Sequence, residues 1–107
     1  MNNKKFVFTI VVNAIITGIL LLGSSSLAAD LKAGADVYKK KCTMCHGEQG
    51  QGGGAIKIND PKVLSKTDKE IRKVIADGSK GMPGYQKLLK PEEIDSLMAF
   101  LRSWSVK

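Results

Sequence analysis

The stretch Cys42-Thr43-Met44-Cys45-His46 organises this 107-residue chain, because it holds both cysteines and the single histidine of the sequence. The two Cys are separated by two residues, and the His follows the second Cys directly. Each thiol can add across a vinyl group of a haem to form a thioether, and the imidazole then lies under the ring and binds the iron. The spacing therefore predicts one covalently attached haem.

Three other uses of these side chains agree less well with the sequence. A structural zinc site needs four ligands, usually as two separated pairs, and the chain has no further Cys or His. A redox-active dithiol usually lies beside a βαβ unit, which no alternating apolar pattern indicates here. A disulfide between cysteines two residues apart is strained and closes almost no loop.

A second signal is the segment Gly81-Met82-Pro83-Gly84-Tyr85, which lies between two predicted helices. Together with the first motif, it resembles the class I c-type cytochromes, whose electron-carrying members bind the haem iron through a His and a Met. The resemblance covers about residues 30–107 and is closest to the small bacterial cytochromes of the c6, c551/c552 and c553 type. It implies that His46 and Met82 are the two axial iron ligands. It also implies an all-α fold of three to four helices wrapped around one haem.

The other methionines have different expected positions. Met1 falls in the N-terminal segment, Met44 faces away from the ring, and Met98 lies on the apolar stripe of the last predicted helix. Met82 is flanked by Gly and Pro. Glycine lets the backbone approach a flat ring, and proline stiffens the backbone.

Further residues are expected to help form the haem site. Tyr85 could donate a hydrogen bond to a propionate, and Ile56 and Ile58 could lie against the ring. In the resembling family, the backbone carbonyl that accepts a hydrogen bond from the ligand His belongs to a Pro after the motif. Pro61 is the nearest candidate here.

The N-terminus predicts a cleaved signal peptide over residues 1–28. Lys4 and Lys5 precede an apolar run over residues 6–22, and small residues end the segment at Ala28. The alternative is a retained membrane anchor, because a run of 17 residues lies at the lower limit for a bilayer span, although polar Asn13 and Thr17 weaken it. With either interpretation of residues 1–28, residues 29–107 are predicted to form the single cytochrome domain, in the periplasm or an equivalent extracytoplasmic compartment.

The formal net charge is +7, from 17 basic and 10 acidic side chains. Two of the lysines lie in the predicted signal peptide, so the mature part keeps a basic excess. Lysines cluster beside the motif and the methionine segment, at Lys39, Lys40, Lys41, Lys80 and Lys87. They could orient an acidic redox partner protein, although a solvated lysine surface explains them equally well. Nothing predicts nucleic-acid binding.

Helical spacing of apolar residues predicts a first helix over residues 30–41 and a last helix that begins at Pro91. Gly34 lies on the apolar face of the first helix, which suggests that another helix crosses closely there. The last helix has an apolar stripe at Ile94, Leu97, Met98, Phe100, Leu101 and Trp104.

A middle helix is predicted to begin at Thr67, because Thr67 and Glu70 match a capping box. Gly78 is placed to end it. Before this helix, five Gly in the eight residues 47–54 predict a loop around the haem edge.

The function predicted from these signals is that of a monomeric one-electron carrier and not of an enzyme. Two protein ligands leave no open iron position for a small-molecule substrate. The alternatives are a pentacoordinate haem sensor or small peroxidase, or a haem subunit of a membrane complex.

Overall fold

A helical segment over residues 27–41 leads into four labelled helices. These are α2 (Thr43–His46), α3 (Pro61–Leu64), α4 (Asp68–Asp77) and α5 (Pro91–Ser103). The computed structural model describes residues 27–105, and in this part of the chain Ser79 and Met82 form one isolated bridge but no strand. The predicted all-α fold is confirmed.

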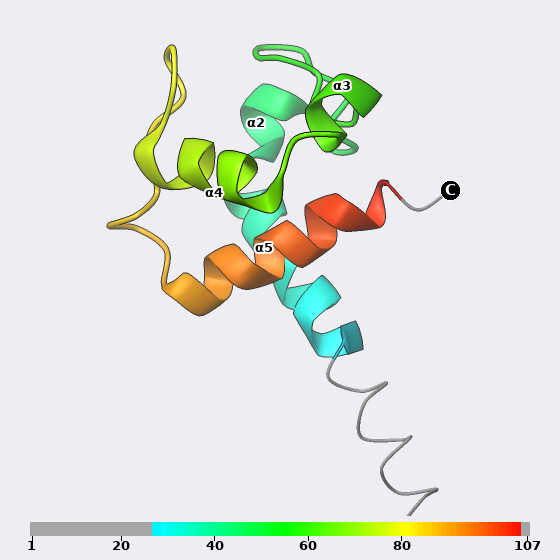
Figure 1. Cartoon of the computed structure of the whole chain (residues 1–107), viewed down its shortest axis with the longest axis vertical. Coiled ribbons are helices and arrows are strands. Elements are labelled where there is room, and N and C mark those ends of the chain that lie inside the picture. The colour runs from blue at the N-terminus through cyan, green and yellow to red at the C-terminus, as the bar shows by residue number, and fades with distance from the viewer. Residues whose placement is uncertain (1–26, 106–107) are drawn as a thin grey trace, which may run out of the picture.

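The helical segment 27–41 and α5 cross each other, as Figure 1 shows. At the crossing, a Cβ added to Gly34 would lie 2.0 Å from the carbonyl oxygen of Ser96 and 2.8 Å from Cβ of Phe100. No side chain fits in that space, so glycine is required for the two backbones to approach. The close crossing predicted at Gly34 is confirmed.

The core forms where the segment 27–41, α4 and the residues before α5 meet the apolar stripe of α5. Its buried members are Tyr38, Ile75, Leu89, Ile94, Leu97, Met98 and Leu101. The Tyr38 ring packs against two rings of α5, with centroids 5.5 Å from Phe100 and 5.3 Å from Trp104. The predicted stripe therefore faces the core, and Met98 is a packing residue.

The helices α4 and α5 begin as the sequence predicts. The Thr67 hydroxyl accepts from the Glu70 amide at 3.2 Å, and a Glu70 carboxylate oxygen accepts from the Thr67 amide at 2.8 Å. Pro91 opens α5, where Glu93 accepts from the Lys90 amide at 2.8 Å. Gly78 follows the last residue of α4 with a φ of +78°.

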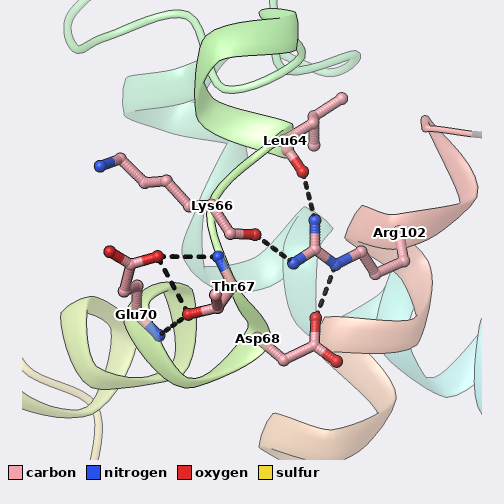
Figure 2. A network of polar contacts seen from close by, with 6 residues as sticks. All are labelled: Leu64, Lys66, Thr67, Asp68, Glu70 and Arg102. Atoms are coloured by element: carbon pink, nitrogen blue, oxygen red, sulfur yellow. Dashed lines mark hydrogen bonds and ion pairs between the residues drawn. The ribbon is translucent and has the colours of Figure 1, made fainter.

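Arg102 joins the end of α5 to the connection between α3 and α4 (Figure 2). Its Nε donates to Asp68 Oδ1 at 2.7 Å, and its two terminal nitrogens donate to the carbonyl oxygens of Leu64 and Lys66. One side chain therefore serves two backbone acceptors and one carboxylate. No sequence pattern predicted this role.

The predicted signal peptide lies outside the described residues, except for Leu27 and Ala28. Within residues 27–105, no helix combines the length and apolar character needed to cross a bilayer.

Candidate functional site

The five-residue motif lies where the helical hydrogen bonding changes register. Residues 27–41 are helical, Cys42 is a turn residue, and α2 follows at once. The Cys42 amide donates to the Tyr38 carbonyl at 2.9 Å, in the helical pattern. The Cys45 amide donates to the Cys42 carbonyl at 3.2 Å rather than to Lys41 four residues earlier. The Lys41 carbonyl therefore lacks its usual helical donor.

The two thiols differ in exposure but are both free. Cys42 is half-buried and Cys45 is exposed. Burial, and then the neighbouring Cys45, raise the pKa of Cys42 to about 11. Reactive dithiols have lowered pKa values, so this environment disfavours a dithiol redox site. Among the described residues, no group of three or more His, Cys, Asp and Glu side chains could hold a metal ion, as a structural zinc site would require.

His46 is the one buried charged or polar side chain in the described part of the chain, with 8% of its surface exposed. Its Nδ1 lies 2.9 Å from the carbonyl oxygen of Ile56. Since a carbonyl can only accept, Nδ1 carries the proton, and the Nε2 lone pair of the neutral ring is left for a metal.

The prediction that the Pro61 carbonyl accepts from His46 is wrong. The Pro61 carbonyl instead accepts from the Ser65 amide at 2.9 Å, as part of α3. Ile56 takes its place because the glycine-rich loop folds back on the motif. In that loop the Gly52 amide donates to the His46 carbonyl at 2.8 Å, and the Ala55 amide to the Cys45 carbonyl at 2.9 Å.

Ile58 belongs to the same loop but packs against the protein core. A Cβ on Gly50 would lie 2.7 Å from the Trp104 ring and 3.0 Å from Ile58 Cγ1. Gly50 also has a φ of +71°. The loop thus approaches the end of α5 through a glycine, with Ile58 beside it. The expected contact between Ile58 and a haem ring stays a prediction.

Met82 ends a tight two-residue turn. The Met82 amide donates to the Ser79 carbonyl at 2.8 Å, and the Ser79 amide donates to the Met82 carbonyl at 3.1 Å. The central residues Lys80 and Gly81 have φ values of +39° and +92°, positive at both positions as in a type I′ turn. The Met82 side chain is half-buried against the core, whereas Met44 is 95% exposed.

Space around the turn is restricted by the residue that ends α4. A Cβ on Gly78 would lie 2.5 Å from the Met82 carbonyl oxygen and 2.8 Å from the Gly84 nitrogen. A glycine at this position therefore allows the methionine segment to fold back tightly on the end of α4.

Each tyrosine hydroxyl holds a backbone carbonyl at one end of the motif. Tyr38 donates to the Gly47 carbonyl at 2.6 Å, and burial is the main cause that raises its pKa to about 12. Tyr85 donates to the Lys41 carbonyl at 3.1 Å, and burial raises its pKa as well. The single proton of Tyr85 is thus already used within the protein. This contact argues against the predicted hydrogen bond from Tyr85 to a propionate.

The lysines proposed for docking are exposed and take no part in the ion pairs of the described region. Those pairs involve other bases, at Lys32, Arg72, Lys73 and Arg102. The exposed lysines are Lys39, Lys40, Lys41, Lys80 and Lys87. Their charges are therefore available to a partner.

The donor set of this site fits a covalently bound haem. Two unpaired thiols lie in the register change at Cys42 and in α2, and α2 ends at a His whose free ring nitrogen is Nε2. The motif spacing found the two Cys and His46. Sequence reasoning missed the Ile56 carbonyl and both tyrosine contacts, because these join segments that only the tertiary fold brings together.

The chain is similar to known proteins over most of its length. A family model described as cytochrome c oxidase, cbb3-type, subunit III matches residues 29–101. Cytochrome c6 of Nostoc sp. is 29% identical over 106 residues, which cover 91% of this chain and 91% of that protein. Cytochrome c6 of Rippkaea orientalis is 31% identical over 91 residues, covering 77% of this chain and 78% of that protein. The cytochrome c subunit of alcohol dehydrogenase (quinone) of Gluconacetobacter polyoxogenes is 32% identical over 91 residues, which cover 69% of this chain and 19% of that protein.

Proposed function

The chain belongs to the class I c-type cytochromes, and from this premise we propose that it carries single electrons between redox proteins through a haem held between His46 and Met82. Its cofactor is one covalent haem c, which supplies an iron that is reversibly oxidised and reduced by one electron. The carrier role, rather than an enzymatic one, agrees with the cytochrome c6 relatives, which match this chain over most of its length.

The observation that carries the proposed ligation by His46 is the hydrogen bond that fixes its tautomer. Its Nδ1 is held 2.9 Å from the Ile56 carbonyl, so Nε2 would be the iron ligand. Cys42 and Cys45 would form the two thioethers. The burial of His46 limits the access of water to the ligand.

Met82 would be the second axial ligand, presented by the turn that ends with it. Reciprocal hydrogen bonds with Ser79 fix the backbone at the methionine. A ligand held in this way closes the sixth position in both oxidation states, which favours electron transfer without substrate binding. The thioether also favours the reduced iron and so raises the potential.

We further propose an extracytoplasmic location and an acidic partner. Residues 1–28 would be removed on export, which leaves residues 29–107 as a monomeric haem domain. The exposed lysines beside Cys42 and Met82 would meet acidic groups on the redox partner. A salt series on the rate of electron transfer to the native partner tests this docking, because the rate should fall as ionic strength rises.

An absorption spectrum of the holoprotein tests the ligand set. The oxidised protein should show the far-red band of a methionine–iron bond, and the reduced protein should fail to bind carbon monoxide. High-spin iron with rapid carbon monoxide binding would instead support the sensor or peroxidase alternative.

A second candidate is a haem subunit of a membrane complex. It is favoured by the description of the matching family and by the similarity to a dehydrogenase subunit. Membrane and soluble fractions, each analysed by intact mass, separate the two. A mature protein found in the membrane fraction and co-purifying with other subunits would favour the complex.

A further inference from the structure

The break in helical bonding at the motif leaves a backbone acceptor that a distant side chain satisfies. The Cys45 amide bonds to Cys42 instead of Lys41. The donor that reaches the Lys41 carbonyl is the Tyr85 hydroxyl, at 3.1 Å and from 44 positions along the chain. The Tyr85 hydroxyl thus supplies the donor that the break in helical bonding removes, so this contact has a local structural reason.

Tyr85 is itself firmly placed by its backbone. Its amide donates to the Ile75 carbonyl at 2.9 Å, which ties it to α4. Its carbonyl accepts from the amides of Leu88 and Leu89 at 3.0 and 2.9 Å. The side chain is half-buried. The backbone of Tyr85 is therefore fixed, and the bond from its hydroxyl to Lys41 can hold the methionine segment in place relative to Lys41.

This hydroxyl is also the sole hydrogen-bonding link, within the described residues, between the methionine segment and the motif. The other bonds of residues 78–86 stay within the turn or go to α4 and the residues before α5. Lys41 immediately precedes Cys42, and Tyr85 follows Met82 by three residues. One hydrogen bond thus bridges the two halves of the proposed haem site.

We propose that Tyr85 is a positioning residue that straps the Met82 segment to the end of the helical segment 27–41, directly before Cys42. The strap holds the methionine sulfur within reach of the iron and disfavours opening of that side of the site. This inference rests on the proposed ligation by Met82. It does not require that Tyr85 contact the haem or titrate.

The test is displacement of Met82 by added imidazole in the oxidised holoprotein. The displacement is measured by the loss of the far-red absorption band. The variant Tyr85→Phe removes one oxygen atom and keeps the ring. The equilibrium constant for displacement should rise about three- to tenfold, the effect of one net hydrogen bond. The matched control is Tyr38→Phe, which also loses a hydroxyl that donates to a carbonyl, at Gly47. It should lower the unfolding temperature and leave displacement within about twofold of the wild type.

The outcomes separate this inference from the proposed function. If the wild type has no far-red band, the Met82 ligation fails, and the strap fails with it. If the wild type has the band and Tyr85→Phe resists imidazole as well as the wild type does, only the strap is overturned. Equal increases in both variants would show a general loss of stability and also overturn it.

A measurement on the wild type stands in if Tyr85→Phe does not accumulate as holoprotein. Nuclear magnetic resonance of the reduced holoprotein should show proximity between the Tyr85 ring protons and the Lys41 α proton. Absence of that contact overturns the strap.

Discussion

The region around His46 and the region around Met82 are held in place in different ways. The motif is braced on both sides, by the Tyr38 hydroxyl on Gly47 and by the returning loop, whose Ile56 carbonyl holds the imidazole. Around Met82 the bonds are mostly local, within a turn that follows a glycine. One long-range side-chain bond, from Tyr85 to the carbonyl of Lys41 directly before Cys42, links this region to the motif.

This difference suggests which side of the site opens first. Regions with few long-range contacts unfold locally at lower free energy than regions embedded in the core. The His46 side would also be tied to the haem by two thioethers. We therefore expect the methionine side to control ligand exchange, and the histidine side to control whether a holoprotein forms.

The largest expected effect comes from removing each ligand in turn. His46→Ala should prevent accumulation of low-spin holoprotein, because the fifth ligand is lost. Met82→Ala should keep the covalent haem and the helices but gain carbon monoxide binding when reduced. Intact mass and absorption spectra measure both outcomes. If Met82→Ala keeps the wild-type spectrum, another group fills the sixth position. The expectation that the methionine side controls ligand exchange is then wrong.

The next effect is expected at Arg102, which fixes the connection between α3 and α4, within the part of the chain that joins the two regions. Arg102→Met should lower the free energy of unfolding by about 2 kcal/mol, because the Leu64 and Lys66 carbonyls lose a charged donor. Arg72→Met is the control, since its ion pair with Asp95 is largely exposed and worth less than about 1 kcal/mol. Denaturant titration of both holoproteins checks the ranking. Equal losses would contradict it.

A smaller gain in stability is expected in the methionine turn. Lys80 is the one non-glycine residue with a positive φ in residues 27–105, a conformation that disfavours most side chains. Lys80→Asn should raise the free energy of unfolding by about 1 kcal/mol, because Asn tolerates this conformation. Lys87→Asn removes the same charge outside the turn and should have no such effect. Thermal unfolding of both variants decides whether backbone strain or charge is responsible.

The smallest effect is expected from the capping box of α4. Hydrogen bonds from the Thr67 backbone and side chain lower the pKa of Glu70. Its contribution is therefore complete above the ordinary pKa of Glu and is lost as the pH falls through the lowered value. The difference in unfolding temperature between wild type and Glu70→Gln should narrow upon acidification. A difference that widens at low pH would contradict the sign.

Local patterns predicted most of the helical frame correctly. Thr67, Glu70 and Gly78 marked the ends of α4, and Pro91 marked the start of α5, because caps and breakers act through neighbouring backbone groups. The spacing of apolar residues predicted the buried face of α5, because side chains on one face of a helix recur at short, regular intervals. Even the crossing at Gly34 was visible, since a glycine within an apolar helical face signals close approach.

Contacts between distant segments were the ones that the sequence did not reveal. Pro61 was proposed as the partner of His46, but the loop fold delivers Ile56. Tyr85 was assigned to a propionate, but its hydroxyl reaches Lys41. Arg102 had no predicted role. In each case a side chain or carbonyl with several potential partners takes the one that chain folding brings nearest.

The sequence by itself therefore determined the cofactor motif, the candidate ligands His46 and Met82, and the helices that surround them. These depend on residue types at short, fixed spacings. Only the tertiary structure decided which carbonyl orients His46 and how the Met82 segment is tied to the motif. Those contacts depend on how loops close between helices, and local sequence does not specify this.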